Sequence, residues 1–184
     1  MMRNPRLAVT LIAAVLGCLV AGCGSDGGNG PSSDGPMGPV MDSGYSCAPV
    51  QAPGDSMSLG GLYVQNQGHQ VITITRISLT GHGLVLTGAW LIPNVRNSGL
   101  GATTPYPPGP DNGISMKLWA TGRSPDGFRL KPRHVATFVF GLAPTSSKGG
   151  IAYPVIHYNS GGTQYVYDSA YGGEVLVGAN ADCP

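Results

Sequence analysis

Residues 70–92 have the sequence QVITITRISLTGHGLVLTGAWLI, in which two apolar runs flank Gly81-His82-Gly83. Apolar side chains occupy alternate positions over most of the second run: Leu84, Leu86, Trp90 and Ile92. Such alternation, with β-branched and aromatic residues, is typical of a β-strand. In the first run the apolar phase shifts between Ile74 and Ile77, which predicts a β-bulge. The stretch therefore predicts two strands joined by a glycine-containing turn.

Short apolar runs separated by Gly, Pro and Asn continue on both sides of this stretch. The predicted strands are 58–66, 70–80, 84–92, 114–120, 135–142, 151–158, 163–168 and 174–177. We find no window of eleven residues with helical periodicity after Cys47. The predicted fold class is all-β: a single antiparallel, immunoglobulin-like β-sandwich of seven or eight strands.

The chain has 184 residues, with 10 Lys and Arg against 9 Asp and Glu. Charged residues make up 10% of it, well below the roughly 25% of an average soluble domain. The near-neutral balance removes the usual electrostatic case for binding nucleic acid. The length allows one domain with accessory segments.

The N-terminus has the pattern of an export signal. Arg3 and Arg6 precede the apolar run 7–20, and small residues follow it. A helix of this length cannot cross a hydrocarbon core of about 30 Å. A cleaved signal peptide is therefore predicted over residues 1–22.

Val20-Ala21-Gly22-Cys23 resembles a bacterial lipobox. The resemblance implies that Cys23 becomes the first mature residue and carries a thioether-linked diacylglycerol. Cys18 is a competing site, which would shorten the apolar run. Two acyl chains anchor a protein stably, whereas one anchors it marginally. We expect the protein on the outer face of the cell membrane, with the membrane as a partner through Cys23.

Residues 23–46 are predicted to be the lipidated cysteine and a disordered linker, followed by one domain over 47–184. Of the 23 residues 24–46, 18 are Gly, Ser, Pro or Asp, and none is basic. Such a composition cannot bury an apolar face.

Cys47 and Cys183 remain once Cys18 is removed and Cys23 is lipidated, and they bracket the predicted domain. Outside the cytoplasm two such cysteines are expected to form a disulfide. In the chain-entropy model this closure stabilises the fold by at most about 5 kcal/mol. A metal site is the alternative, but no C-x-x-C or neighbouring His ligand supports it. We predict no metal and no cofactor.

A turn Asn-x-Gly, a strand V-T-I-x-x-[IV]-x-L and a strand G-L-x-L-x-G-A-x-L-x-P follow one another in the first third of the domain. The matching residues are Asn66, Gly68, Val71, Thr73, Ile74, Ile77, Leu79, Gly83, Leu84, Leu86, Gly88, Ala89, Leu91 and Pro93, with Tyr158 and Tyr165 in a later hairpin. These motifs resemble short lipoproteins and secreted β-sandwich proteins of high-GC Gram-positive bacteria. The resemblance implies a tethered sandwich and no particular activity.

The sequence lacks the motifs of the common catalytic sites. A serine hydrolase elbow, G-x-S-x-G, does not occur. Gly54-Asp55-Ser56 is similar to the opening block of the GDS-type esterases, but those enzymes are larger α/β proteins. Asp168 and Glu174 flank one connection and could form the carboxylate pair of a glycoside hydrolase. Acidic residues at a hairpin are more commonly solvated, so this activity is not supported. We predict that the protein is not an enzyme.

Three features are candidates for a contact surface. The first is the long 93–113 segment, which contains Tyr106 and a proline-rich core. The second is a basic segment that ends at His134 and contains Arg123, Arg129, Lys131 and Arg133. The alternative is that this segment is only a solvated loop. The third is the pair Tyr165 and Tyr167, which either form a stacking platform or pack across strands.

The expected function is that of a non-catalytic interaction or accessory module of the cell envelope, tethered by lipid. Its partner would be an envelope protein or polymer, or anionic lipid head groups at the basic segment. The alternative is a lipoprotein that binds a small ligand, such as a glycan, or a metal.

Overall fold

Strand β8, Val135–Pro144, lies at the centre of the fold and is buried at all ten of its residues. It pairs with a strand on each side, in a computed structural model that describes residues 34–40, 44–96, 101–110, 116–178 and 181–183. The first sheet has the order β1 (Met37–Pro39), β3 (Met57–Asn66), β8 and β5 (Leu84–Pro93), with β6 (Ala102–Thr103) beside β3. Its strands are all antiparallel.

The second sheet is built around β9, Gly150–Ser160. Its order is β2 (Gly44–Val50), β11 (Tyr171–Val177), β9, β4 (Ile72–His82) and β7 (Arg129–Leu130), and β10 (Thr163–Asp168) also pairs with β9. Strand β2 runs parallel to β11 over seven residue pairs, and the other pairings are antiparallel. The predicted antiparallel sandwich is therefore corrected to one antiparallel and one mixed sheet.

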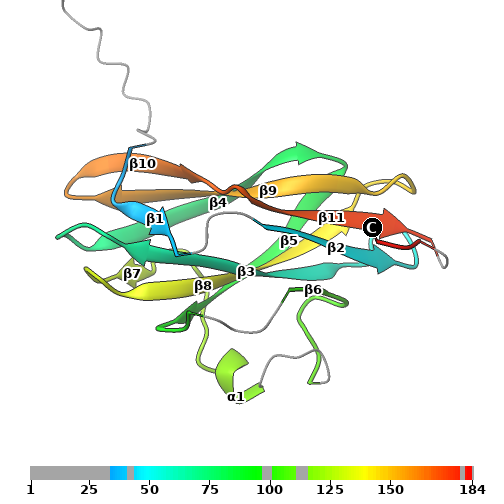
Figure 1. Cartoon of the computed structure of the whole chain (residues 1–184), viewed down its shortest axis with the longest axis horizontal. Coiled ribbons are helices and arrows are strands. Elements are labelled where there is room, and N and C mark those ends of the chain that lie inside the picture. Colours follow the sequence, from blue (N-terminus) through cyan, green and yellow to red (C-terminus); the bar gives the residue numbers. More distant parts are fainter. Residues whose placement is uncertain (1–33, 41–43, 97–100, 111–115, 179–180, 184) are drawn as a thin grey trace, which may run out of the picture.

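The two sheets face each other as a β-sandwich (Figure 1). The orders β1-β3-β8-β5 and β11-β9-β4 correspond to strands A-B-E-D and G-F-C of an immunoglobulin domain. The predicted immunoglobulin-like sandwich is confirmed. Eleven strands occur in the described residues rather than seven or eight, because β2 and the short strands β1, β6 and β7 line the edges.

The core lies between the sheets, and alternate residues of β8 face it. Ala136, Phe138, Phe140 and Leu142 are all buried in it. The disulfide between Cys47 and Cys183 is confirmed, with Cα atoms 5.7 Å apart. It joins β2 to the C-terminal segment.

The described parts of the connection between β5 and β8 cover the outer face of the first sheet (Figure 1). Here α1, Met116–Trp119, forms a single turn. The predicted strand 114–120 is wrong over residues 116–119. Leu118 and Trp119 both belong to a cluster on this face that is built around Ile92 and Val139. Neighbours on one strand cannot both do so, because their side chains point to opposite faces.

A bulge in β5 moves Trp90 and Ile92 to that outer cluster. The pairing of β5 with β8 shifts between Leu86 and Gly88. Before the shift Leu86 faces the core, and after it Leu91 does. An extra residue in a strand exchanges its two faces. The alternation expected for Leu84, Leu86, Trp90 and Ile92 is therefore wrong after the bulge, because Trp90 and Ile92 lie on the face opposite to Leu84 and Leu86.

The N-terminal part of the sandwich begins earlier than predicted. Met37 is 5% exposed and pairs with Asn66, and β2 begins at Gly44. The predicted disordered linker is therefore wrong for residues 37–39 and 44–46. Composition measures the apolar content of a segment and does not show the edge hydrogen bonds that its backbone makes.

The predicted signal peptide and Cys23 lie outside the described residues. None of the helices within the described ranges is long and apolar enough to span a membrane.

Candidate functional site

Most of the basic segment predicted from the sequence surrounds a cleft of about 220 Å³ at one end of the sandwich. The cleft is lined by Pro93, Asn94, Arg123, Phe128, Arg129, Leu130, Lys131 and His134. Arg123, Arg129, Lys131 and His134 are exposed, and no acidic residue is among the described residues that line the cleft. We call this site the basic cleft.

A tight turn over residues 131–134 forms one wall of the basic cleft. The His134 N–H donates to the Lys131 carbonyl at 3.1 Å, and Arg133 has φ 66°. With Pro132 at its second position, this is the arrangement of a type II turn, which favours Gly or Asn at the third position. Arg133 therefore holds a left-handed conformation that a glycine would adopt with less strain.

Asn66, at the end of β3, holds this turn in place. Its backbone carbonyl accepts from the Arg133 N–H at 2.8 Å, and its backbone N–H donates to the His134 carbonyl at 3.0 Å. Its side-chain amide donates to the carbonyls of Gln70 and Leu130 at 2.7 and 2.9 Å. Its amide oxygen accepts from the Gly68 N–H at 3.0 Å. The Asn-x-Gly motif of the sequence thus positions the basic turn.

Arg123 is held at the opposite wall by its backbone and its side chain. Its N–H and carbonyl each hydrogen-bond to Leu91 at 2.9 Å, which extends the edge of β5. Its guanidinium lies 5.8 Å from the centre of the Phe128 ring, within range of a cation–π interaction. Phe128 ends a turn over residues 125–128 that is closed by its N–H donating to the Pro125 carbonyl at 3.0 Å, with Gly127 at φ 69° in the third position.

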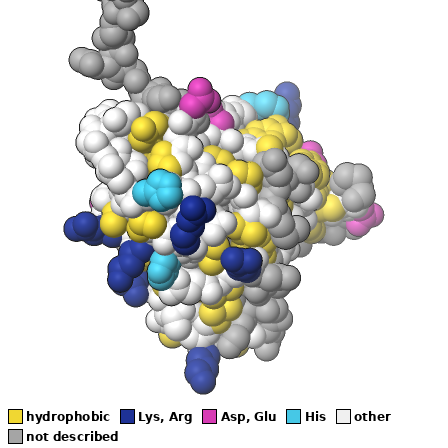
Figure 2. Space-filling view, turned by 60° about the vertical axis from the view of Figure 1, so that its left-hand side comes forward, with side chains coloured by type: hydrophobic (Ala, Val, Ile, Leu, Met, Phe, Trp, Pro, Cys, Tyr) yellow, Lys and Arg dark blue, Asp and Glu magenta, His cyan; other side chains and the backbone are white. Residues whose placement is uncertain are grey.

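Charge is concentrated around the basic cleft. Residues 123–134 contain four of the ten Lys and Arg and one of the nine acids, a net charge of +3, so the rest of the chain carries −2. That acid, Asp126, lines a neighbouring pocket instead. Figure 2 shows Lys and Arg side chains gathered around His side chains where this end of the sandwich turns toward the reader.

Tyr106 lies away from the basic cleft, over the outer face of the first sheet. Its ring lies on Gly88 and Gly141, where a Cβ atom would collide with it. It meets Trp119 edge-on at 6.4 Å, and burial raises the pKa of its hydroxyl. Tyr106 therefore anchors the β5–β8 connection, and the structure does not bring it together with Arg123, Arg129, Lys131 and Arg133.

Tyr165 and Tyr167 lie on β10, beside the N-terminal segment. Tyr165 stacks on the buried Tyr158 at 5.4 Å, and Gly35 lies close against its ring. Tyr167 is half-buried and packs against the core. Tyr165 lines a pocket of about 580 Å³ with polar residues that include His69 and Gln70. The cross-strand packing considered from the sequence is thus present.

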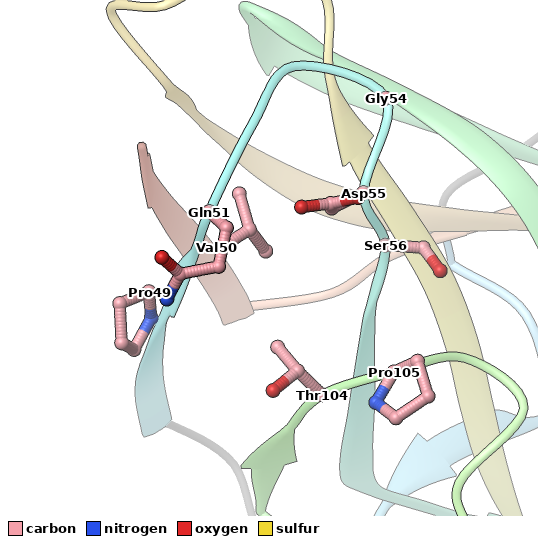
Figure 3. Close-up of a pocket in the computed structure, with 8 residues that line it drawn as sticks. All are labelled: Pro49, Val50, Gln51, Gly54, Asp55, Ser56, Thr104 and Pro105. Carbon is pink, nitrogen blue, oxygen red and sulfur yellow. The ribbon is translucent and has the colours of Figure 1, made fainter. Parts of the chain in front are cut away.

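The Gly54-Asp55-Ser56 stretch lines a separate pocket of about 420 Å³ near Thr104 and Pro105. The Asp55 carboxylate accepts from the Ala52 N–H at 2.9 Å, and the Ser56 hydroxyl donates to the Tyr106 carbonyl at 3.2 Å. Figure 3 shows the two side chains pointing away from each other. These groups support local structure, and within the described ranges no His lines this pocket.

His157 contacts two polar side chains of β4, Arg76 and Ser78. Its Nε2 lies 3.1 Å from the Arg76 guanidinium and 2.9 Å from the Ser78 hydroxyl. Because a guanidinium only donates, Nε2 accepts and the neutral ring is favoured. Burial and then the Arg76 charge lower the pKa of His157, against a smaller opposing effect of Asp168. In the described part of the chain, no three His, Cys, Asp or Glu side chains are placed to hold a metal.

Reasoning from the sequence missed three contributors to the basic cleft. Asn94 has φ 60° and its side chain hydrogen-bonds to His134 at 2.9 Å. Phe128 lies under Arg123, and Asn66 supports the turn from β3. Only Asn66 had a signal, the Asn-x-Gly motif.

No protein-family model matches the chain, and no curated protein matches its sequence. Among solved structures, the PapD-like domain 7 of human CEP192 has 11% identity and a TM-score of 0.39, covering 97% of this chain and 100% of that domain. The VesB protease of Vibrio cholerae has 8% identity and a TM-score of 0.38, covering 77% of this chain and 32% of VesB. A family 123 glycoside hydrolase of Clostridium perfringens has 15% identity and a TM-score of 0.35, covering 72% and 23%. This chain spans about a third of VesB and a quarter of the hydrolase. At TM-scores this low the similarities carry no functional assignment.

Proposed function

We propose that the protein is a lipid-anchored, non-catalytic module of the cell envelope that contacts an anionic partner through the basic cleft. The observation that carries this proposal is the lining of the cleft. Three exposed cations and His134 surround it, and its described lining contains no acid. A phosphate-bearing envelope component has the charge that such a site favours.

The membrane anchor rests on the lipobox-like sequence that ends at Cys23. The intact mass of the protein from its native membrane tests it directly. We expect the mass of residues 23–184 with a diacylglyceryl group, and two thiols that appear only after reduction. An unmodified Cys23 would overturn the anchor and leave the cleft to be tested separately.

A non-catalytic role is supported by the structural contacts that the reactive side chains make. Ser56 and Asp55 hold a turn and the Tyr106 segment, and the pair Cys47–Cys183 forms a disulfide. The neutral ring of His157 faces an arginine rather than a nucleophile–acid pair.

Binding of the full chain to immobilised polyphosphate tests the contact surface. Exchange of Lys131 and Arg133 in the double variant K131Q/R133G is expected to weaken binding about 25-fold, from about fivefold per cation. The matched control K117Q/K148Q removes two exposed cations from other surfaces and should change binding by less than about twofold. Equal losses in both variants would mean that net charge, rather than the cleft, causes binding.

A glycan site beside Tyr165 is the second candidate, favoured by the pocket of about 580 Å³ that this ring lines. Loss of binding to envelope glycans in Tyr165→Ala, with binding retained in the cleft variant K131Q/R133G, would support it. Binding that survives Tyr165→Ala would exclude it.

A further inference from the structure

The chain enters the sandwich beside the basic cleft. The Pro36 carbonyl accepts from the Gln67 N–H at 2.8 Å, and the Met37 N–H donates to the Tyr158 hydroxyl at 3.1 Å. Asn66, the neighbour of Gln67, makes backbone hydrogen bonds to the 131–134 turn. The entry point of the chain and the basic turn therefore bond to two consecutive residues, Asn66 at the end of β3 and Gln67 directly after it.

The length of chain before this point limits how far the entry point lies from the membrane. Asp34 lies eleven positions after Cys23, and a chain segment of that length spans at most about 40 Å. A lipidated Cys23 lies at the level of the head groups. An anchor at Cys23 therefore keeps the entry point, and with it the end of the sandwich that bears the basic cleft, within about 40 Å of the head groups.

Charge favours the same end. Residues 123–134 carry +3, and Asp34 opposes them with a single charge. The acids Asp55, Glu174 and Asp182 belong to the β2–β3 turn, β11 and the C-terminal segment, toward the opposite end (Figure 1). An anionic surface attracts the first end and repels the second. Because screening limits this attraction to about 10 Å, only the end held near the membrane experiences it.

We propose that the partner of the basic cleft is the anionic bilayer that holds the anchor, and that the domain docks on it with the β7 end facing the lipid. This rests on the proposed function, because it takes both the Cys23 anchor and the anion contact of the cleft as given. A wall polymer has similar charge, but nothing in the structure relates the entry point of the chain to a polymer. The bilayer accounts for the charge and for its position beside the tether.

The three lysines of the chain report on this orientation without any substitution. Lys131 lines the basic cleft, Lys117 lies on α1, and Lys148 lies in the turn between β8 and β9. All three are exposed. We would reconstitute the lipidated full chain in vesicles of phosphatidylcholine alone or of phosphatidylcholine with phosphatidylglycerol. The rate of acetylation of each lysine would then be measured by mass spectrometry.

Docking is expected to slow the acetylation of Lys131 about fivefold in the vesicles that contain phosphatidylglycerol, and to leave Lys117 and Lys148 within about twofold. The protection should disappear at about 1 M salt, where the Debye length is about 3 Å. Equal rates for all three lysines in both kinds of vesicle, or protection of Lys148 instead, would overturn the inference.

A third arm separates this inference from the proposed function. Polyphosphate is added to the protein in phosphatidylcholine vesicles. Protection of Lys131 by polyphosphate but not by phosphatidylglycerol would overturn membrane docking and keep the anion contact. No protection by either would overturn both.

A variant confirms that the basic turn causes the effect. Arg133→Gly removes a cation and replaces a left-handed arginine with the residue that this turn position favours, so the fold is expected to be retained. We expect the protection of Lys131 to fall by about fivefold, whereas Lys148→Gln should leave it unchanged. Protection of Lys131 that Arg133→Gly leaves unchanged would overturn the role of this turn.

Discussion

The two ends of the sandwich are built on different principles. At one end the disulfide Cys47–Cys183 closes the fold covalently, and the Tyr171 hydroxyl donates to the Gly60 carbonyl at 2.7 Å. At the other end backbone hydrogen bonds from Asn66 hold a turn in which Arg133 has a positive φ. The covalent closure thus lies away from the proposed contact surface. Stability and contact chemistry are therefore expected to respond to different substitutions.

Removal of the disulfide gives the largest expected effect. The double variant Cys47→Ser/Cys183→Ser is expected to lower the free energy of unfolding by about 3–5 kcal/mol, because the unfolded chain loses the closure of a loop of 136 residues. Urea denaturation of the wild type, with and without reductant, measures the same quantity. Binding of polyphosphate at low temperature should persist in the folded fraction. Loss of binding without unfolding would show that the two ends are coupled.

Asn66→Ala is expected to give the largest effect at the basic end. Truncation removes three side-chain hydrogen bonds of a fully buried amide and should lower the free energy of unfolding by about 3 kcal/mol. The control Asn159→Ala, at a half-buried residue of β9, should lower it by less than about 1 kcal/mol. Urea denaturation measures both values. Equal losses would refute the supporting role of Asn66.

Arg133→Gly should separate stability from binding. Relief of the left-handed backbone offsets the greater freedom that glycine gives the unfolded chain, so the free energy of unfolding should change by less than about 1 kcal/mol. Polyphosphate binding should weaken about fivefold. Denaturation and binding measured on the same preparation test both statements. A loss of several kcal/mol would mean that the Arg133 side chain is itself structural.

The smallest expected effect is a pH dependence at His157, between the two ends. Burial and Arg76 lower its pKa in the folded state, so the unfolded chain takes up a proton first as the pH falls below about 6.5. Protonation of His157 therefore does not lower the free energy of unfolding above that pH. The free energy of unfolding declines as the pH falls toward the lowered pKa of the folded state. Denaturation midpoints over this interval should move down in the wild type and less in His157→Gln. Identical slopes would assign the effect to other groups.

The sequence predicted those elements whose signal is local. The apolar run over residues 135–142 predicted the central strand β8, and the phase shift after Ile74 predicted the bulge of β4. The basic segment was also found, because clustered charge is visible in the sequence itself. These signals lie in neighbouring residues and need no partner to be recognised.

Other features depended on a partner strand. The faces of Trp90 and Ile92 were predicted wrongly because the bulge between Leu86 and Gly88 is defined only by its pairing with β8. The pairing of Met37 with Asn66 was missed because an edge strand of three residues is stabilised by the neighbour that it meets. Asn94 was also missed, because it lines the cleft beside His134, to which it hydrogen-bonds across forty residues of the chain.

By itself the sequence determined an all-β fold, a disulfide between its last two cysteines and a basic segment near residue 130, because hydrophobic periodicity, cysteine count and charge are properties of the chain. Tertiary structure alone decided which face each half of β5 presents and that the chain enters the sandwich beside the basic turn. Both depend on the hydrogen-bond register between strands that lie far apart in the sequence. The register places Asn66 between Pro36 and Arg133 in space, and no local pattern contains that arrangement.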